Sequence, residues 1–233
     1  MGDSEMVKSV SARLSAVTEL IGKCGTLADV GCDHAYVAIG AVRNGRAEKA
    51  YASDIKKGPL ENAGREIKKA GLEDRITTVL CNGLEKIPPC ECVVIAGMGG
   101  EMIADIISRA EWVRKNCTLI LQPMTRADIL RSYLYENGFE TEKEIFVRDA
   151  GKLYCILRVR GGEKCAYEPF EKYISREGLG SDGAEEYVDS IIKRLEYEYG
   201  QRKSSHAVSG SELCRRGEDI ESLREMREKT WKR

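Results

Sequence analysis

The stretch Leu27-Ala28-Asp29-Val30-Gly31-Cys32-Asp33-His34-Ala35-Tyr36 decides how the rest of the chain is interpreted. An apolar run ends there in a short turn with one glycine and two acids, and a helix of small and branched residues follows over residues 37–42. A buried strand, a polar glycine-containing turn and a helix make the opening βα unit of a nucleotide-type cofactor site. The stretch therefore predicts an α/β domain with a ligand at the end of its first strand.

Strand and helix patterns alternate outward from this stretch as far as residue 138. Further strands are expected over residues 49–54, 75–80, 92–96 and 118–122, the last closed by Pro123, and helices over residues 8–22, 59–70, 101–110 and 126–136. The strand over residues 92–96 is wholly apolar, which predicts a central strand buried on both faces. This alternation is typical of a parallel sheet with helices on both faces.

The pattern changes after residue 138, where two β-rich segments over residues 139–148 and 152–160 have only three residues between them. No helix fits in that gap, so the two segments predict an antiparallel hairpin. A dinucleotide-binding Rossmann fold would continue with a sixth parallel strand instead. We therefore predict the α/β class I methyltransferase fold, a seven-stranded, mostly parallel Rossmann-like sheet with a terminal antiparallel hairpin.

A compositional boundary lies at Gly161-Gly162, beyond which Val, Ile and Leu become sparse and charged residues dense. Tyr187, Ile191, Leu195 and Tyr199 recur every fourth position and predict one helix, and a second is expected over residues 211–232. We predict a cofactor-binding domain over residues 1–160 and a helical, coiled-coil-like appendage over residues 161–233.

The bulk composition excludes several classes of protein. The net charge is −1, so no overall basic field indicates nucleic acid, although a local patch remains compatible with it. The nine cysteines include no CxxC pair, and the spacing of Cys90-Glu91-Cys92 does not suit zinc. We expect buried thiols in a reducing cytoplasm and no structural metal. No apolar run approaches ~20 residues and no signal pattern is present, so we expect no membrane span.

Polar residues and glycines gather where the predicted strands end, and in open α/β sheets ligands bind outside the carboxyl ends of the strands. The candidates in chain order are Asp29, Gly31, Cys32, Asp33, His34, Asp54, Ile55, Asn82, Gly83, Gly97, Met98, Gly99 and Gln122. We assign Asp33, His34 and Gln122 to catalysis and the others to cofactor binding.

The acids select the kind of cofactor. Asp54 ends the second strand, where a carboxylate can accept both ribose hydroxyls of an adenosine. The first turn lacks the G-x-G-x-x-G pattern of dinucleotide sites and carries two carboxylates that would repel a pyrophosphate. The same charges suit the ammonium and sulfonium of S-adenosylmethionine. Asn82-Gly83 fits an adenine-side turn, and the glycines around Met98 let the backbone approach a ligand closely.

Structural interpretations stand beside these functional ones. Asp54 can serve as a helix N-cap near Pro59, and Asp29 can be a surface acid. Asn82-Gly83 can be an ordinary turn, and His34 a structural histidine. The other histidine, His206, is expected in an exposed polar connector.

Four motifs together carry a family resemblance. Leu-Ala-Asp-Val-Gly-Cys-Asp-His-Ala-Tyr, Ala-Ser-Asp-Ile-Lys-Lys-Gly-Pro-Leu, Ile-Ala-Gly-Met-Gly-Gly and Leu-Ile-Leu-Gln-Pro resemble the bacterial tRNA (adenine-22-N1)-methyltransferase family, TrmK. The resemblance is collinear over residues 8–160, whereas the C-terminal part matches only in kind. Pro123-Met124 departs from the family pattern, in which a more polar residue is expected after the proline.

The resemblance implies methylation of the Watson–Crick edge of a tRNA adenine with S-adenosylmethionine. Neutral adenine has a lone pair on N1, so positioning does most of the work once the base is exposed. Asp33, beside His34, is then the expected acceptor for the exocyclic amine, and Gln122 a hydrogen-bonding partner for the base. Basic residues for tRNA are expected near the ligand edge and in the tail, at Lys8, Arg13, Lys56, Lys57, Arg126, Arg202, Lys203, Arg215, Arg216 and residues 229–233.

Three other functions stay open at this point, as does the oligomeric state. A small-molecule methyltransferase would have a closed lid over residues 97–100, whereas an RNA enzyme would present an open basic face. A non-catalytic cofactor-binding scaffold would use its helical tail to dock a partner. An NAD oxidoreductase is disfavoured by the acidic first turn and by the terminal hairpin.

Overall fold

The computed structural model describes residues 11–164, 166–205 and 210–232 of the chain. The strands are β1 (Cys24–Val30), β2 (Ala47–Asp54), β3 (Ile76–Leu80), β4 (Cys92–Gly99), β5 (Thr118–Thr125), β6 (Phe139–Asp149) and β7 (Lys152–Gly161). The α-helices are α1 (Ala12–Leu20), α2 (Tyr36–Arg43), α3 (Lys57–Lys69), α4 (Gly100–Ser108), α5 (Ala127–Glu136), α6 (Ala184–Ser205) and α7 (Gly210–Trp231). Three short 3-10 helices are η1 (Glu111–Arg114), η2 (Pro169–Lys172) and η3 (Arg176–Gly178).

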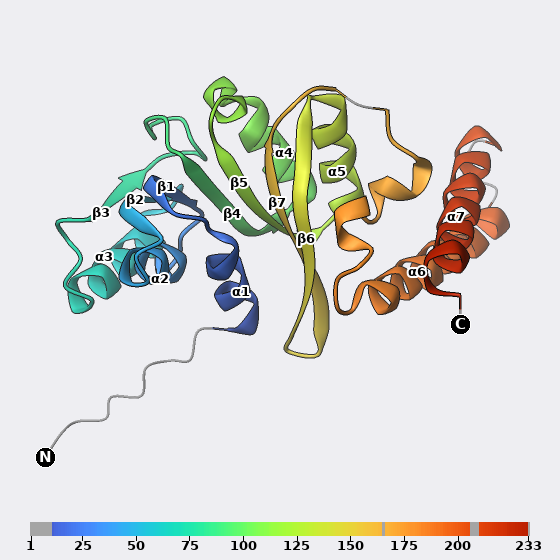
Figure 1. Ribbon diagram of the computed structural model, residues 1–233, viewed down its shortest axis with the longest axis horizontal. Coiled ribbons are helices and arrows are strands. Elements are labelled where there is room, and N and C mark those ends of the chain that lie inside the picture. Colours follow the sequence, from blue (N-terminus) through green and yellow to red (C-terminus); the bar gives the residue numbers. More distant parts are fainter. Residues whose placement is uncertain (1–10, 165, 206–209, 233) are drawn as a thin grey trace, which may run out of the picture.

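All seven strands form one sheet in the order β3-β2-β1-β4-β5-β7-β6 (Figure 1). Strands β1 to β5 are parallel, whereas β7 runs antiparallel to β5 and β6 antiparallel to β7. Two hydrophobic clusters line the sheet, one packed under α1, α2 and α3 and the other under α4 and α5. The predicted fold class, with its terminal hairpin, is confirmed.

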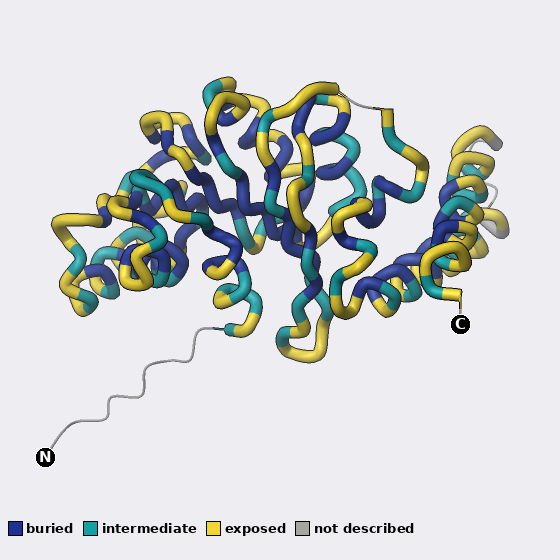
Figure 2. Tube along the Cα trace, viewed as in Figure 1, coloured by how far each residue is buried: buried dark blue, intermediate teal, exposed yellow. Residues whose placement is uncertain are grey.

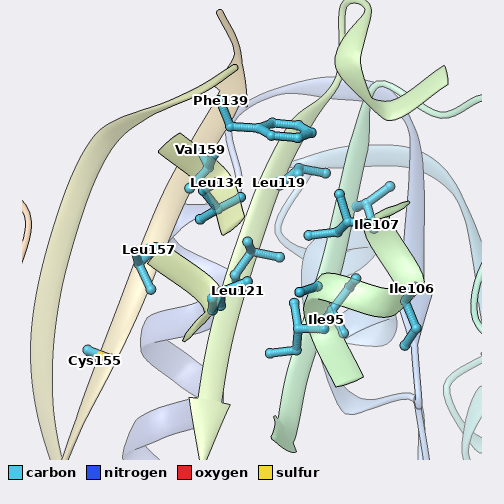
Figure 3. Packing of buried hydrophobic residues seen from close by; sticks show 14 of the residues in the cluster. Ile95, Ile106, Ile107, Leu119, Leu121, Leu134, Phe139, Cys155, Leu157 and Val159 are labelled. Atoms are coloured by element: carbon cyan, nitrogen blue, oxygen red, sulfur yellow. The ribbon is translucent and has the colours of Figure 1, made fainter. Parts of the chain in front are cut away.

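The middle of the sheet is buried on both faces, as the apolar sequence of β4 predicted. Val94 belongs to the cluster under α2, and Val93 and Ile95 belong to the opposite cluster, because successive strand residues point to opposite faces. Figure 3 shows Ile95 beside the β5 residues and beside Ile106 and Ile107 of α4. This packing holds the carboxyl ends of β1, β4 and β5 in fixed positions, and those ends carry the candidate residues.

Some predicted boundaries differ from the structure. The prediction that Pro123 closes the fifth strand is wrong, because β5 continues to Thr125 and Pro123 pairs with Met98 across an irregular register. A proline is tolerated there because the β-bulge relaxes the ladder at the end of the strand. The first helix begins at Ala12, where the Ser11 side chain accepts from the backbone N–H of Leu14, and residues 8–10 lie outside the described part of the chain.

The predicted helical appendage is present as α6 and α7, and α6 packs against the outer strands. The Tyr187 and Phe146 rings lie 4.6 Å apart, and the apolar face of α6 belongs to the same cluster as the strands. Figure 2 shows buried residues along both tail helices. Arg131 of α5 and Glu144 of β6 form a buried ion pair. Glu144 also accepts from the N–H of Ser175, which belongs to the segment that connects β7 to α6. The division at residues 160 and 161 stays a prediction, and His206 lies outside the described residues.

The described residues bear on the expectations for cysteines, for metal binding and for membrane-spanning helices. The eight described cysteines are free thiols, and Cys165 lies outside the described residues. Within residues 11–164, 166–205 and 210–232, no cluster of three or more His, Cys, Asp or Glu side chains is arranged to hold a metal ion. No helix in the same ranges is long and apolar enough to cross a membrane.

Candidate active site

The turn after β1 is held in an unusual backbone conformation. Gly31, Asp33 and Ala35 all have positive φ, at 70°, 48° and 56°. The N–H groups of Gly31 and Cys32 both donate to the carbonyl of Ser53, at 2.8 and 3.0 Å. Two non-glycine residues in the left-handed region indicate strain of the kind that gathers at functional sites. The turn is therefore tied to the end of β2, directly before Asp54.

Six of the predicted cofactor residues line one cavity of about 430 Å³ at this edge of the sheet. They are Gly31, Asp54, Ile55, Asn82, Gly83 and Met98. One wall comes from α4, through Met102, Ile106 and the ion-paired Asp105 and Arg109, which the sequence analysis missed. Met102 and Ile106 are four residues apart, and so are Asp105 and Arg109. This spacing places the two members of each pair on one helix face, and it is the sequence signal from which the wall could have been predicted. The volume is in the range of small-molecule sites.

Asp54 lines this cavity, and its Oδ1 accepts a hydrogen bond from the Lys56 N–H at 2.9 Å. The alternative interpretation as a helix cap is wrong, because Lys56 occupies the N-cap position of α3 and no side chain caps that helix. The apolar side chains of Ile55, Met98 and Met102 suit a purine ring. An acid beside apolar walls fits an adenosine, so the residues present suit S-adenosylmethionine.

Asp29 and Asp33 differ in environment although they belong to one turn. Asp29 is 5% exposed, and its Oδ2 accepts from the Ala38 N–H of α2 at 3.2 Å. Burial raises the pKa of Asp29 to about 7, against the lowering effect of that hydrogen bond. The surface-acid interpretation of Asp29 is therefore wrong. The Asp33 side chain, in contrast, is 67% exposed, with an oxygen 3.8 Å from His34 Nε2.

His34 and Cys32 complete the turn. The His34 ring stacks on Tyr36, with ring centroids 5.3 Å apart and planes 14° apart. Cys32 is buried beneath the turn, and burial, followed by the nearby Asp29 carboxylate, raises the pKa of its thiol. Neither residue lines the cofactor cavity, so the roles assigned to them stay predictions.

The glycines around Met98 serve the packing of the protein as well as the cavity. A Cβ on Gly31 would lie 2.2 Å from Met98 Cε, so Met98 covers the turn after β1. A Cβ on Gly100 would lie 2.1 Å from the Arg126 carbonyl oxygen, so this glycine lets α4 meet the start of α5. A Cβ on Gly99 would lie 3.3 Å from Thr125 Oγ1. We expected glycines at these positions because a ligand approaches the backbone closely. The close packing of neighbouring protein segments is a second reason for them.

Gln122 is fully buried between the ends of β4 and β5. Its Oε1 accepts from Arg13 Nη1 at 2.5 Å and from the Gly97 N–H at 3.1 Å. Its Nε2 donates to the Pro123 carbonyl at 2.9 Å. Protein groups therefore engage both ends of the amide, and the predicted contact with a base stays a prediction.

A second cavity, which we call the groove, has a volume of about 420 Å³ and lies beyond the end of β5. It is lined by residues from the start of α5, from the β6–β7 turn and from α6. Figure 1 shows α6 on one side of the β6–β7 hairpin. Five of its lining residues are basic and two are acidic: Arg126, Arg131, Arg148, Lys152, Arg194, Asp128 and Glu186. Met98 lines the first cavity and its register partner Pro123 lines the groove, so lining residues of the two spaces pair across β4 and β5.

The tail cations expected to meet tRNA are mostly engaged within the helical pair. Arg216 of α7 donates to Glu198 of α6 at 2.6 Å, and Arg202 pairs with Glu212. Their neutralisation favours a role in holding α6 to α7. Four arginines of the groove are likewise paired with carboxylates: Arg126 with Asp128, Arg131 with Glu144, Arg148 with Glu186 and Arg194 with Glu198. Among the groove cations, the exposed Lys152 is therefore the best placed for a polyanion.

The strand order, the reversed hairpin and the acids at the ends of β1 and β2 define a class I methyltransferase. A family model described as a methyltransferase domain matches residues 10–157. The tRNA (adenine(22)-N(1))-methyltransferase of Bacillus subtilis is 36% identical over 160 residues, which are 67% of this chain and 67% of that protein. The chain belongs to the family of tRNA (adenine(22)-N(1))-methyltransferases, as the resemblance predicted.

Solved structures agree over nearly the whole chain. The crystal structure of the B. subtilis M1A22 tRNA methyltransferase TrmK has a TM-score of 0.80 and 28% identity, with 93% of this chain and 97% of that chain covered. Streptococcus pneumoniae Sp1610 in complex with S-adenosyl-L-methionine has a TM-score of 0.78 and 29% identity, with 93% and 98% covered. The similarity therefore includes the helical appendage.

Proposed function

We propose that this protein transfers the methyl group of S-adenosylmethionine to N1 of an adenine in tRNA, with adenine 22 as the target. One observation carries the proposal. A cavity lined by Asp54 and by apolar side chains and a groove lined by five basic residues contribute neighbouring residues, Met98 and Pro123, at the ends of β4 and β5. The cofactor and a polyanionic substrate can therefore meet at the carboxyl ends of β4 and β5.

We assign the cofactor contacts as follows. Asp54 accepts from the ribose hydroxyls, Asn82 lies at the adenine edge, and Met98 and Met102 pack on the purine. The first N–H groups of a helix lack acceptors within it, and in α2 those of Ala38 and Ile39 bond to Asp29 and to the Ala35 carbonyl. The N–H groups of Tyr36 and Val37 are then the donors for the cofactor carboxylate.

The chemistry requires little acid–base work from the protein. When bound, S-adenosylmethionine supplies an electrophilic methyl group. The adenine N1 lone pair forms the new bond while the bond from the methyl carbon to sulfur breaks, and its electron pair stays on sulfur. The positive charge moves to the adenine ring. Asp33, exposed at the same edge, is our candidate for accepting a hydrogen bond from the exocyclic amine and stabilising that charge.

The groove is the proposed site for the tRNA strand on either side of the target base. Lys152 at the hairpin turn and Arg194 on α6 are exposed and line it. An open basic face favours RNA over a small molecule, which would call for a closed lid. Methyltransferase residues 1–160 and appendage residues 161–233 would then each contribute one wall.

Incubation of the purified protein with labelled S-adenosylmethionine and bulk tRNA tests the proposal. We expect label at N1 of adenine 22, none in a transcript with guanine at position 22, and strongly reduced labelling with Asp54→Ala at a fixed, limiting cofactor concentration. Label on free nucleosides or other small molecules but not on tRNA would favour the small-molecule alternative. Cofactor binding without any transfer would favour the scaffold.

A further inference from the structure

We propose that Arg13 is a positioning residue that sets the spacing between the cofactor cavity and the groove. Arg13 comes from α1, the helix that precedes the first strand, and its side chain is 19% exposed. Arg13 therefore belongs to a helix that precedes the βα units of the predicted site, and its side chain is mostly buried. The inference rests on the proposed function, because it concerns the geometry of the same methyl transfer.

The contacts of Arg13 join four elements. Nη1 donates to Gln122 Oε1 of β5 at 2.5 Å, and Nε lies 3.9 Å from Asp149 Oδ2 at the end of β6. The guanidinium carbon lies 5.8 Å from the centre of the Tyr154 ring of β7. A Cβ on Gly97 of β4 would lie 3.9 Å from Arg13 Nη1. The guanidinium therefore fills the corner where the sheet edge meets the hairpin.

Arg13 and the backbone groups of Gly97 and Pro123 together define the orientation of the Gln122 amide. A glutamine amide has an acceptor end and a donor end, which can exchange places by a flip. Arg13 and the Gly97 N–H both present donors to one end, so Oε1 faces them and Nε2 faces the Pro123 carbonyl. Gly97 precedes Met98 of the cofactor cavity, and Pro123 lines the groove. Arg13 thereby sets the separation of the two strand ends between which the methyl group moves.

This arrangement revises the expectation that Arg13 is a tRNA contact. Its guanidinium is engaged by Gln122, by the Asp149 carboxylate and by the Tyr154 ring, and it is largely buried. A phosphate contact would need an exposed cation, as at Lys152. A misplacement of ~1 Å can cost roughly 100-fold in rate, so a positioning role predicts an effect on kcat.

The test compares Arg13→Ala and Arg13→Lys with Arg43→Ala in the full chain. Arg43 is an exposed arginine at the end of α2, away from the carboxyl edge of the sheet, and serves as the matched control. For Arg13→Ala we expect kcat to fall by roughly 10- to 100-fold, with KM for tRNA and Kd for S-adenosylmethionine within about threefold. Amide exchange at Gly97 becomes faster. Arg13→Lys keeps one donor and recovers part of kcat, and it also serves if Arg13→Ala is poorly folded.

A double-mutant cycle with Gln122→Ala completes the test. If Arg13 acts through Gln122, the double variant is no slower than the slower single variant. Additive losses, or unchanged exchange at Gly97, overturn the proposal. A raised KM for tRNA at constant kcat, with a salt dependence shallower by about one charge, would make Arg13 a phosphate contact and also overturn it. If wild type transfers no methyl group to tRNA, the proposed function fails, while exchange at Gly97 still tests the contact.

Discussion

The turn beside the cofactor cavity and the exposed cations of the groove place charge in different surroundings, although Arg131 of the groove is itself buried against Glu144. Beside the cavity, an acid is buried, and burial raises the pKa of Asp29 to about 7. Along the groove, charges such as those of Lys152 and Arg194 are exposed to water. A buried charge costs folding energy, whereas an exposed one costs little and is screened by salt. Ionisation of Asp29 therefore lowers the folding stability, whereas the exposed charges of Lys152 and Arg194 cost the fold little.

The largest expected effect is on stability, through Asp29→Asn. The folded-state pKa of about 7 lies above the ordinary aspartate value of 3.8, so the folded protein binds the proton more tightly than the unfolded chain. The stability that comes from this proton is full below pH ~4 and is lost as the pH rises through 7. At 1.36 kcal/mol for each pKa unit, ionisation costs about 4 kcal/mol by pH 8.

Asn can still accept from the Ala38 N–H but carries no charge. We therefore expect Asp29→Asn to raise Tm relative to wild type at pH 8 and to leave it nearly unchanged at pH 4, as measured by thermal unfolding. Asp33→Asn, the same substitution in the same turn but at a 67% exposed side chain, is the matched control for the effect of burial. Equal Tm differences at both pH values would mean that Asp29 is not a strained buried acid.

The next effect is on cofactor affinity, through Asp54→Ala. Hydrogen bonds to a charged acceptor contribute about 1.5–3 kcal/mol each, so loss of two ribose contacts costs about 3 kcal/mol or more and weakens binding by at least roughly 100-fold. Calorimetric titration with S-adenosylmethionine measures this, and tRNA affinity should stay within about twofold of wild type. A parallel loss of tRNA affinity would remove the functional separation between the cavity and the groove.

The smallest expected effect is on the groove, through Lys152→Ala. One exposed cation lost from a phosphate contact weakens tRNA binding a few-fold and makes the salt dependence of log Kd shallower by about one charge. Lys68→Ala, at an exposed position near the end of α3, is the matched control and should change neither quantity. Cofactor affinity is expected to be unchanged in both variants. An equal effect of the two substitutions would assign tRNA binding to the overall field of the protein.

The predictions of secondary structure and fold succeeded where a short segment of sequence determines its own local structure. The alternation of strands and helices and the hairpin after residue 138 follow from periodicity. The positions of strand ends bring six of the candidate residues to one cavity, and their cofactor contacts stay a prediction. Pro123 was misjudged because a proline usually ends a strand, and the bulge that admits it depends on pairing with β4. The wall of the cavity formed by α4 was not predicted, because tertiary packing decides which face of a helix points toward a cavity.

The opening turn separates the two kinds of information most clearly. The sequence by itself determined that Asp29 and Asp33 lie at the end of the first strand, because that depends only on local patterns. Only the tertiary structure decided that Asp29 is buried against α2 and that Asp33 is exposed. Likewise, only the folded chain brings Arg13 to Gln122, 109 positions away. Burial and long-range contacts are set by packing, and they decide what each charge can do.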